Sequence, residues 1–310
     1  MGRFNDRATT PSRGFNDILR WRLGIGSPGA PRPVREPRGA FTPPRRAPDT
    51  ALIESGAAQL TWIGHASFLI TLGGKRILID PVLAAKLGPV PRISPPGIAL
   101  ADLPPIDLVL ITHNHRDHLD GWTISRLGQR PAYIAPLGHR ALLQKLGATR
   151  VTELDWWQST EVGSLVITLV PARHWSMRFP WDRNDMLWGG YTIRGPEGTA
   201  YHSGDTGFFE GFAEIGERTG PIDWAMLPIG AYEPRWFMEP QHMNPQDAIE
   251  AARLLRARTM VAMHWGTFRL TDEPLAEPPV RAREAHRSSG GAADDLWVLD
   301  IGETRPLTRR

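Results

Sequence analysis

The sequence predicts a mixed α/β domain, and three observations support this prediction. Between residues 58 and 270, short apolar runs typical of strands are interspersed with segments of helical periodicity. The polar residues that carry chemistry follow directly after those runs, as they do where strands end in loops at one edge of a sheet. At 310 residues with 41% hydrophobic content, the chain can bury one large core.

Residues 1–50 are predicted to form a basic arm rich in proline and arginine, and residues 51–310 a single domain. The arm holds ten arginines and four acidic residues among many prolines and glycines, which argues against an independent core. Residues 15–23 place apolar side chains at helical spacing. That spacing fits either peripheral contact with an anionic membrane or packing along the domain or at a homodimer interface. No nucleic-acid-binding motif accompanies the charge, so no nucleic-acid partner is expected.

The densest group of chemically active side chains follows a buried strand predicted at residues 106–111. That run is short, apolar and β-branched, and polar residues follow it: Thr112-His113-Asn114-His115-Arg116-Asp117-His118-Leu119-Asp120. Side chains two positions apart in an extended segment point the same way, so His113 and His115 can converge on one ion. Asp117 and His118 lie just beyond and suit a second ion. Three of the ten histidines fall within this short segment, which a solvated polar loop does not explain.

Further strands and helices are predicted downstream. Three apolar runs predict strands at residues 166–170, 199–203 and 258–263, and a last strand is predicted at 296–299. The first three are followed by His174, Asp205 and His264. Helices are predicted at 121–130, 136–146 and 244–258, the last with Asn244 as N-cap and Pro245 at the first helical position. The repeated occurrence of His or Asp after a strand predicts that these side chains gather at one edge of the sheets.

This pattern resembles the metallo-β-lactamase superfamily and, within it, the N-acyl-phosphatidylethanolamine-hydrolysing phospholipase D group and its bacterial relatives. The resemblance is carried by residues 61–67, 79–81, 112–120, 171–175, 203–207, 228–238, 241–245 and 263–268. The histidine motif is common to many hydrolases, whereas residues 228–238 are much more specific. The resemblance implies a four-layer αβ/βα sandwich, in which two packed mixed β-sheets lie between outer helices and metal ions lie at one edge.

The resemblance also implies the ligands of two metal ions. One zinc ion would be held by His113, His115 and His174. The other would be held by Asp117, His118 and His264, with Asp205 bridging the two. These nitrogen and oxygen ligands suit Zn²⁺, and the same set accepts Fe or Mn. Asp117, Asp205 and His242 are the expected catalytic residues.

His242 and Asp80, which lie beside this ligand set, each have two possible roles. His242 is a phosphate-binding or leaving-group-protonating residue if the resemblance holds, or a helix-entry histidine bonded to the backbone. Asp80 either orients an imidazole of the metal set or caps a turn. His65 is expected to be structural. Trp181 and Trp188 flank a polar stretch and are expected on a loop beside the substrate.

The expected activity is hydrolysis of a phosphodiester by a hydroxide shared between the two ions. Only the resemblance indicates the substrate, a phospholipid of the N-acyl-phosphatidylethanolamine type. A lactone or other ester on the same centre is the alternative, as is a non-catalytic membrane-binding protein that keeps zinc for stability. The chain has no cysteine, and no apolar run approaches the roughly 18 residues of a membrane span. We therefore expect a cytoplasmic protein, peripheral at the membrane if the arm binds lipid.

Overall fold

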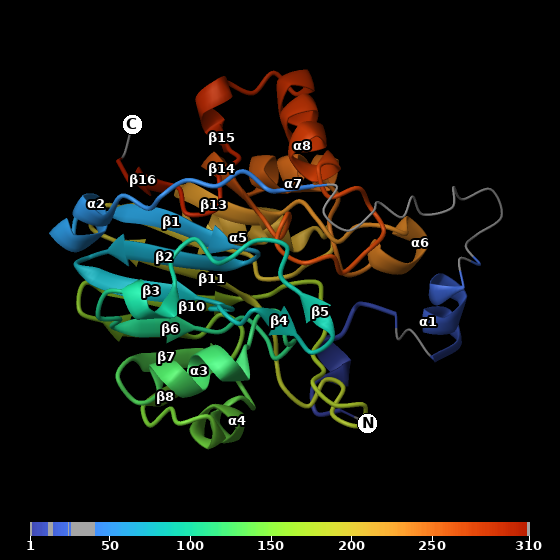
Figure 1. Cartoon of the computed structure of the whole chain (residues 1–310), viewed down its shortest axis with the longest axis horizontal. Coiled ribbons are helices and arrows are strands. Elements are labelled where there is room, and N and C mark those ends of the chain that lie inside the picture. Colours follow the sequence, from blue (N-terminus) through green and yellow to red (C-terminus); the bar gives the residue numbers. More distant parts are fainter. Residues whose placement is uncertain (1, 12–14, 24, 26–40, 309–310) are drawn as a thin grey trace.

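The computed structural model describes residues 2–11, 15–23, 25 and 41–308. Two seven-stranded sheets form its centre (Figure 1). The first has the order β16-β1-β2-β3-β6-β7-β8 and the second the order β15-β14-β13-β12-β11-β10-β9. Both are mixed, because antiparallel pairs at one side of each sheet adjoin parallel pairs at the other. The predicted α/β fold with two packed mixed sheets is therefore confirmed.

The strands of the two sheets follow the chain in two blocks, apart from the last strand. The first sheet contains β1 (Gln59–Gly64), β2 (Ser67–Leu72), β3 (Lys75–Ile79), β6 (Leu108–Leu110), β7 (Ala132–Pro136), β8 (Val151–Leu154) and β16 (Thr304–Pro306). The second contains β9 (Ser159–Val162), β10 (Leu165–Val170), β11 (Gly190–Gly195), β12 (Gly198–His202), β13 (Ile222–Pro228), β14 (Ala257–Met263) and β15 (Leu296–Trp297). A separate pair is formed by β4 (Lys86–Leu87) and β5 (Val90–Pro91).

Helices lie on the outer faces of the two sheets, with α7 and α8 on one side and α3 and α4 on the other (Figure 1). Those on the first sheet are α2 (Thr50–Ser55), α3 (Gly121–Leu127) and α4 (Arg140–Lys145), and those on the second are α5 (Gly211–Thr219), α7 (Pro245–Leu254) and α8 (Glu277–Ser288). Two more are α1 (Phe15–Arg22) and α6 (Arg235–Met238), and short 3₁₀ turns span Asn5–Arg7, Leu100–Asp102 and Ala293–Asp295.

Alternating side chains of the buried strands build two hydrophobic clusters. In β2, Phe68 and Ile70 face the second sheet, whereas Leu69 packs with Ile124 of α3 and Leu143 of α4. A strand buried on both faces reads as a continuous apolar run, which is the pattern found here. The large cluster between the sheets fixes the edge at which the strand ends meet.

Several predicted elements have different bounds in the structure; the helix predicted at 121–130, for example, ends at Leu127. The predicted helix at 136–146 is wrong at its start, because Pro136 ends β7, which pairs with β8, and the helix begins only at Arg140. The predicted helix at 244–258 ends at Leu254, since Ala257 already pairs in β14. Its start is as predicted, with an Asn244 capping box and Pro245 in the first turn. The strand predicted at 296–299 is limited to β15.

The first described residues of the arm pack against the domain. Phe4 is buried in the cluster between the sheets, and Arg7 pairs with Asp155. Farther along, Trp21 of α1 lies against Phe237 and donates to Asp272. The proline-rich remainder of the predicted arm, residues 26–40, lies outside the described residues. Within the part of the chain that is described, no helix has the length and apolar character that a bilayer span requires.

Candidate metal centre

The predicted ligands lie where strands end at one edge between the two sheets. The histidine-rich loop follows β6 of the first sheet, and His174, Asp205 and His264 follow β10, β12 and β14 of the second. These three strands run in the same direction, since β10 and β12 are both antiparallel to β11, and β12, β13 and β14 are parallel. Their carboxyl ends therefore meet, as the sequence predicts.

One group of three imidazoles is formed by His113, His115 and His174, whose potential ligand atoms all lie within 4.8 Å of one another. Nδ1 of His115 is 2.9 Å from Nε2 of His113 and 3.2 Å from Nε2 of His174. The other ring nitrogen of His174 lies 3.1 Å from the carbonyl oxygen of Gln241, a contact that fixes the ring when that nitrogen carries the proton. Three ring nitrogens thus face a common point.

A second group contains Asp117, His118, His264 and also His65. Asp205 lies between the two groups: its Oδ2 is 3.1 Å from Nε2 of His118, and its Oδ1 is 3.1 Å from Nε2 of His264. The same Oδ2 lies 3.9 Å from Nε2 of His174 and 4.0 Å from Nε2 of His113. One carboxylate therefore reaches both groups.

Burial and charge set His113, His174 and Asp205 in the protonation states that a metal ion requires, whereas the neighbouring carboxylates raise the pKa values of His118 and His264, whose protons a bound cation would displace. Burial holds the pKa values of His113 and His174 well below the usual value, which leaves those imidazoles neutral. Burial alone would raise the pKa of Asp205, but the neighbouring His118 and His264 outweigh it and hold that pKa well below its usual range. Neutral imidazoles and ionised carboxylates are the forms that bind metal ions.

Unpartnered polar atoms provide an independent test of whether the side chains fit a cation. Among the described residues, several buried site atoms have no hydrogen-bond partner: Nε2 of His115, Nε2 of His118, Oδ1 of Asp205, Nδ1 of His242 and both ring nitrogens of His264. A buried polar atom without a partner costs about 1–3 kcal/mol, so a cluster of them is costly unless a ligand satisfies it. A bound cation would satisfy Oδ1 of Asp205, Nε2 of His118 and one ring nitrogen of His264, and the residues fit one.

Asp80 lies against the ring of His118, on the side away from Asp205. Its Oδ2 lies 2.7 Å from Nδ1 of His118 and accepts from the Thr112 hydroxyl at 2.6 Å, while its Oδ1 accepts from the Thr112 amide at 2.8 Å. The Asp80 side chain is completely buried. This carboxylate can fix the tautomer and orientation of His118, which is the first of the two readings of the sequence.

His242 lies at the cluster rather than facing away from it. Its Nδ1 is 4.0 Å from Oδ2 of Asp205, and its ring centroid is 5.4 Å from that of His174 and 5.6 Å from that of His264. The segment between α6 and the capped start of α7 places it there. Its side chain is 12% exposed, so it can contact a ligand that enters from solvent.

His65 is the functional candidate that the sequence reasoning missed. Its Nε2 lies 3.1 Å from Oδ2 of Asp117, and its ring centroid is 3.9 Å from that of His264. The Thr267 hydroxyl accepts from the backbone N–H of His65 at 2.7 Å and anchors the turn. His65 directly follows β1, so the rule that identified the other strand-end residues could also have found it.

The two tryptophans expected beside the substrate differ in position. Trp188 lies on the loop before β11, but its side chain is 1% exposed and donates to the carbonyl of Ala172, so it packs in the core and not beside the substrate. Trp181 is 79% exposed on the loop that follows His174. The buried indole N–H of Trp188, which donates to a backbone carbonyl, is typical of tryptophans in a core.

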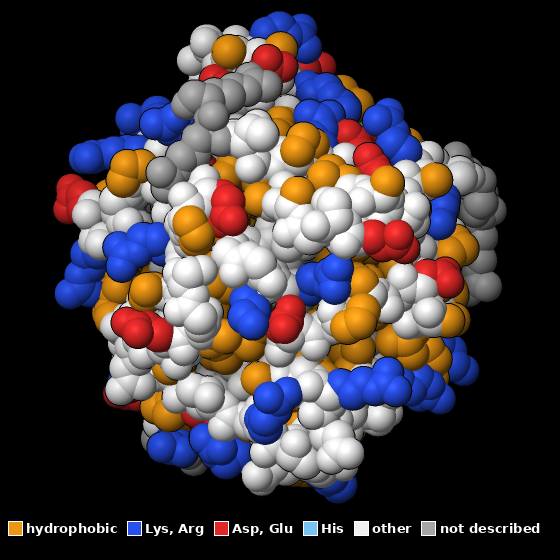
Figure 2. Space-filling view, turned by 90° about the vertical axis from the view of Figure 1, so that its left-hand side faces the viewer, with side chains coloured by type: hydrophobic (Ala, Val, Ile, Leu, Met, Phe, Trp, Pro, Cys, Tyr) orange, Lys and Arg blue, Asp and Glu red, His pale blue; other side chains and the backbone are white. Residues whose placement is uncertain are grey.

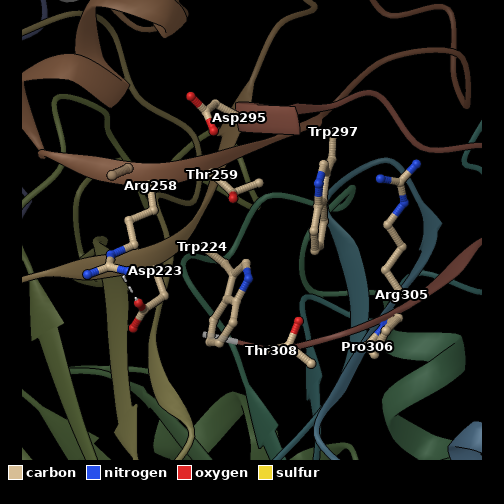
Figure 3. A pocket seen from close by; sticks show the side chains of 10 residues that line it. Asp223, Trp224, Arg258, Thr259, Asp295, Trp297, Arg305, Pro306 and Thr308 are labelled. Carbon is tan, nitrogen blue, oxygen red and sulfur yellow. Dashed lines mark ion pairs between the residues drawn. The ribbon is translucent and has the colours of Figure 1, made fainter. Parts of the chain in front are cut away.

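Away from the histidine cluster, a hollow lies at the opposite ends of the strands (Figure 3). Trp224 and Trp297 form its walls, and Arg258 lies 3.6 Å from Asp223 at its border. Asp223 and Arg258 begin β13 and β14, whereas the histidine cluster follows their carboxyl ends. Figure 2 shows the face of the molecule that lies at the left of Figure 1. Basic, acidic and hydrophobic side chains are interspersed on this face, and no histidine is visible there. The histidine cluster is therefore the candidate active site.

Comparisons with known proteins match this geometry. A family model described as a beta-lactamase superfamily domain matches residues 75–265. N-acyl-phosphatidylethanolamine-hydrolyzing phospholipase D 1 of Caenorhabditis elegans is 38% identical over 264 residues, which cover 78% of this chain and 74% of that protein. A UPF0173 metal-dependent hydrolase of Methanopyrus kandleri is 34% identical over 250 residues, covering 79% of this chain and 98% of that protein.

A solved structure has the same fold. Igni18, described as a novel metallo hydrolase from the archaeon Ignicoccus hospitalis, superposes with a TM-score of 0.63 at 26% sequence identity. The match covers 82% of this chain and 100% of that one.

The contact between His65 and Asp117 yields a testable prediction. Replacing His65 with Gln removes the imidazole that orients Asp117, and we expect metal affinity to fall by about 10- to 100-fold. The measurement is a competition titration of metal-free protein with Co²⁺ and a chromophoric chelator. His286→Gln, at a histidine far from the cluster whose Nε2 lies 2.7 Å from the carbonyl oxygen of Ala292, is the matched control. Unchanged affinity of the His65 variant would show that the ring only packs.

Proposed function

The chain belongs to the beta-lactamase superfamily and is a metal-dependent hydrolase, and we propose that it is a binuclear zinc phosphodiesterase acting on a phospholipid of the N-acyl-phosphatidylethanolamine type. The observation that carries this proposal is the position of Asp205. One buried carboxylate reaches two groups of imidazoles, which is the arrangement that two neighbouring ions need. The name of the Caenorhabditis elegans relative supports the substrate class.

In this proposal, His113, His115 and His174 hold one ion, and Asp117, His118 and His264 hold the other, with Asp205 as the shared ligand. Imidazole nitrogen and carboxylate oxygen are ligands that Zn²⁺ accepts, and Fe or Mn can use the same set. When bound, a pair of such ions polarises a phosphoryl oxygen and lowers the pKa of a water molecule toward neutrality.

The residues of the chain contribute charge balance, orientation and proton transfer. Asp117 and Asp205 offset the positive charge at the centre, and Asp80 holds the ring of His118 in one orientation. His242 is the remaining partly exposed imidazole at the cluster, where it can donate a proton to the departing alcohol or a hydrogen bond to a phosphoryl oxygen. When a P–O bond of the phosphodiester breaks, the leaving oxygen takes such a proton and departs as an alcohol.

The amphipathic helix α1 supports peripheral membrane contact. Ile18, Leu19, Leu23 and Ile25 are all at least 41% exposed in and after this helix. Its Trp21 packs against Phe237 of α6, so the helix is held on the domain while these apolar side chains face solvent. Exposed apolar side chains beside arginines are typical of segments that lie in the interface of an anionic bilayer.

The first prediction concerns the metal ligands. Asp117→Asn keeps the size of the side chain but removes its charge, and we expect turnover to fall by about 10²- to 10³-fold together with loss of bound metal. The measurements are turnover, metal content by elemental analysis and the far-ultraviolet circular dichroism spectrum, which should stay close to that of the parent because the fold is kept. Asp102→Asn, at an exposed acid in the 3₁₀ turn Leu100–Asp102, is the control.

The substrate decides between phosphodiester and ester chemistry. Bis-p-nitrophenyl phosphate, N-acyl-phosphatidylethanolamine and a panel of lactones are compared with the same metal-loaded protein. Turnover of the two phosphodiesters supports the proposal. Lactone turnover alone refutes it, and full biological function of an inactive Asp117→Asn variant points to a zinc-stabilised binding protein.

The second prediction separates His242 from the metal ligands. His242→Gln should lower turnover by about 100-fold while the metal content stays at the level of the parent protein. The loss should be smaller for a substrate whose alcohol leaves readily, such as p-nitrophenol, than for a lipid. Equal losses on both substrates, or loss of metal, would contradict a role in protonating the leaving group.

The third prediction concerns α1. Replacing Leu19 and Leu23 with Ser removes two exposed apolar side chains, and we expect weaker co-sedimentation with vesicles that contain phosphatidylglycerol. Raising the salt concentration should weaken binding of the parent protein as well, because the arm is basic. A change from dimer to monomer in the variant, with vesicle binding retained, would instead identify α1 as an interface between copies.

A further inference from the structure

An exposed aromatic pair lies on the loop after His174. Trp181 is 79% exposed and Phe179 is 41% exposed, and their rings stack with centroids 5.3 Å apart and planes only 4° apart. The two rings expose apolar surface to water, and burying that surface against a partner would be favourable. Stacking covers part of each ring, but the outer faces stay open.

The loop holds this pair in a fixed position. Oδ1 of Asp182 accepts from the backbone N–H groups of Arg178 and Phe179, both at 2.8 Å. The side chain of the buried Asn184 accepts from the N–H of Ser176 at 3.1 Å and donates to Asn5 at 2.9 Å. Because these bonds hold the loop backbone, its ordering adds little to the cost of binding.

The pair borders the metal centre. The guanidinium carbon of Arg116, which stands between the predicted ligands His115 and Asp117, is 5.8 Å from the centroid of the Phe179 ring. At the other end of the loop, Trp175 contacts the ring of His115, with centroids 4.5 Å apart. A surface that seats on the aromatic pair would therefore lie against the entrance to the histidine cluster.

Arg116 lies over the Phe179 ring and Arg183 follows Trp181 by two positions in the chain. Arg116 and Arg183 form no ion pair with any carboxylate in the described part of the chain; each instead lies over an aromatic ring, Arg183 at 4.2 Å from that of Trp175. The nearby Asp182 is buried and is used by the loop backbone. Exposed aromatic rings beside unpaired cations match the interface of an anionic bilayer, where rings sit among the headgroups and arginines meet phosphates.

We propose that the loop of residues 176–185 docks on an anionic lipid bilayer through the Phe179 and Trp181 rings, and so places the metal centre at the membrane surface. This inference rests on the proposed lipid phosphodiesterase function and adds to it the surface that meets the substrate's bilayer. α1 is a separate apolar segment and is not needed for this contact.

The test compares two variants of the full-length, metal-loaded protein. Phe179→Ser with Trp181→Ser removes the pair, and Trp122→Ser removes another exposed indole, which is 43% exposed on α3 and is also covered by an arginine. Binding is measured by co-sedimentation with phosphatidylcholine vesicles that contain phosphatidylglycerol, and with phosphatidylcholine alone. Melting temperature and size-exclusion elution check the fold and the oligomeric state.

We expect the double variant to partition onto the anionic vesicles about tenfold less than the parent protein, and Trp122→Ser to partition within about twofold of it. Equal partition of the double variant and the parent would overturn the proposal, as would an equal loss in Trp122→Ser. A parent dimer that dissociates in the double variant would assign the pair to a second copy of the chain and also overturn it. The vesicles contain no substrate, so absence of phosphodiesterase activity would refute the proposed function and leave this result standing.

Discussion

The structure depends on the burial of Asp205 among imidazoles that come from both sheets. A buried carboxylate is expensive unless positive charge and hydrogen-bond donors surround it. Here His118 and His264 approach its two oxygens at 3.1 Å, one from each sheet. The backbone must turn sharply to bring Asp205 there: Gly204 has a φ of 60°, and a Cβ on it would lie 2.9 Å from both the Gly189 carbonyl oxygen and Cβ of Thr112. Only glycine fits that turn.

Backbone strain is concentrated at the same edge. His65, Asp80 and His264 all have positive φ values, of 55°, 42° and 64°. A residue other than glycine in this region costs about 1–3 kcal/mol and persists only where its surroundings determine it. Each of the three is held by a bond to a neighbouring segment, for example from the amide of His264 to the carbonyl of His65 at 3.0 Å. The strained backbone therefore lowers the stability of the fold but orients these three side chains. This is expected of a site that must keep a fixed geometry.

The sequence predicted the arrangement of the cluster because strand ends are local signals. An apolar run followed by His or Asp predicts both the end of a strand and the side chain at that end. This signal was sufficient to predict the positions of His113, His174, Asp205 and His264. The same signal was present at His65, but a single histidine in a Gly-His-Ala segment does not reveal that a loop 52 residues later brings Asp117 to it. The prediction that Trp188 lies beside the substrate is wrong for the same reason. Its burial depends on contacts with the cluster between the sheets, which the order of residues in the sequence does not reveal.

The division of the cluster between the two sheets has a consequence for stability. The first sheet contributes His65, Asp80 and the histidine-rich loop, and the second contributes His174, Asp205 and His264. An ion held by both sets binds only when the two sheets are docked, so its binding energy is added to that of the hydrophobic cluster between them. Without an ion, the unpartnered nitrogens of His115, His118 and His264 oppose that docking. The same residues therefore act against the fold when the ion is absent and in its favour when it is bound, which couples the integrity of the sheet edge to the capacity for hydrolysis.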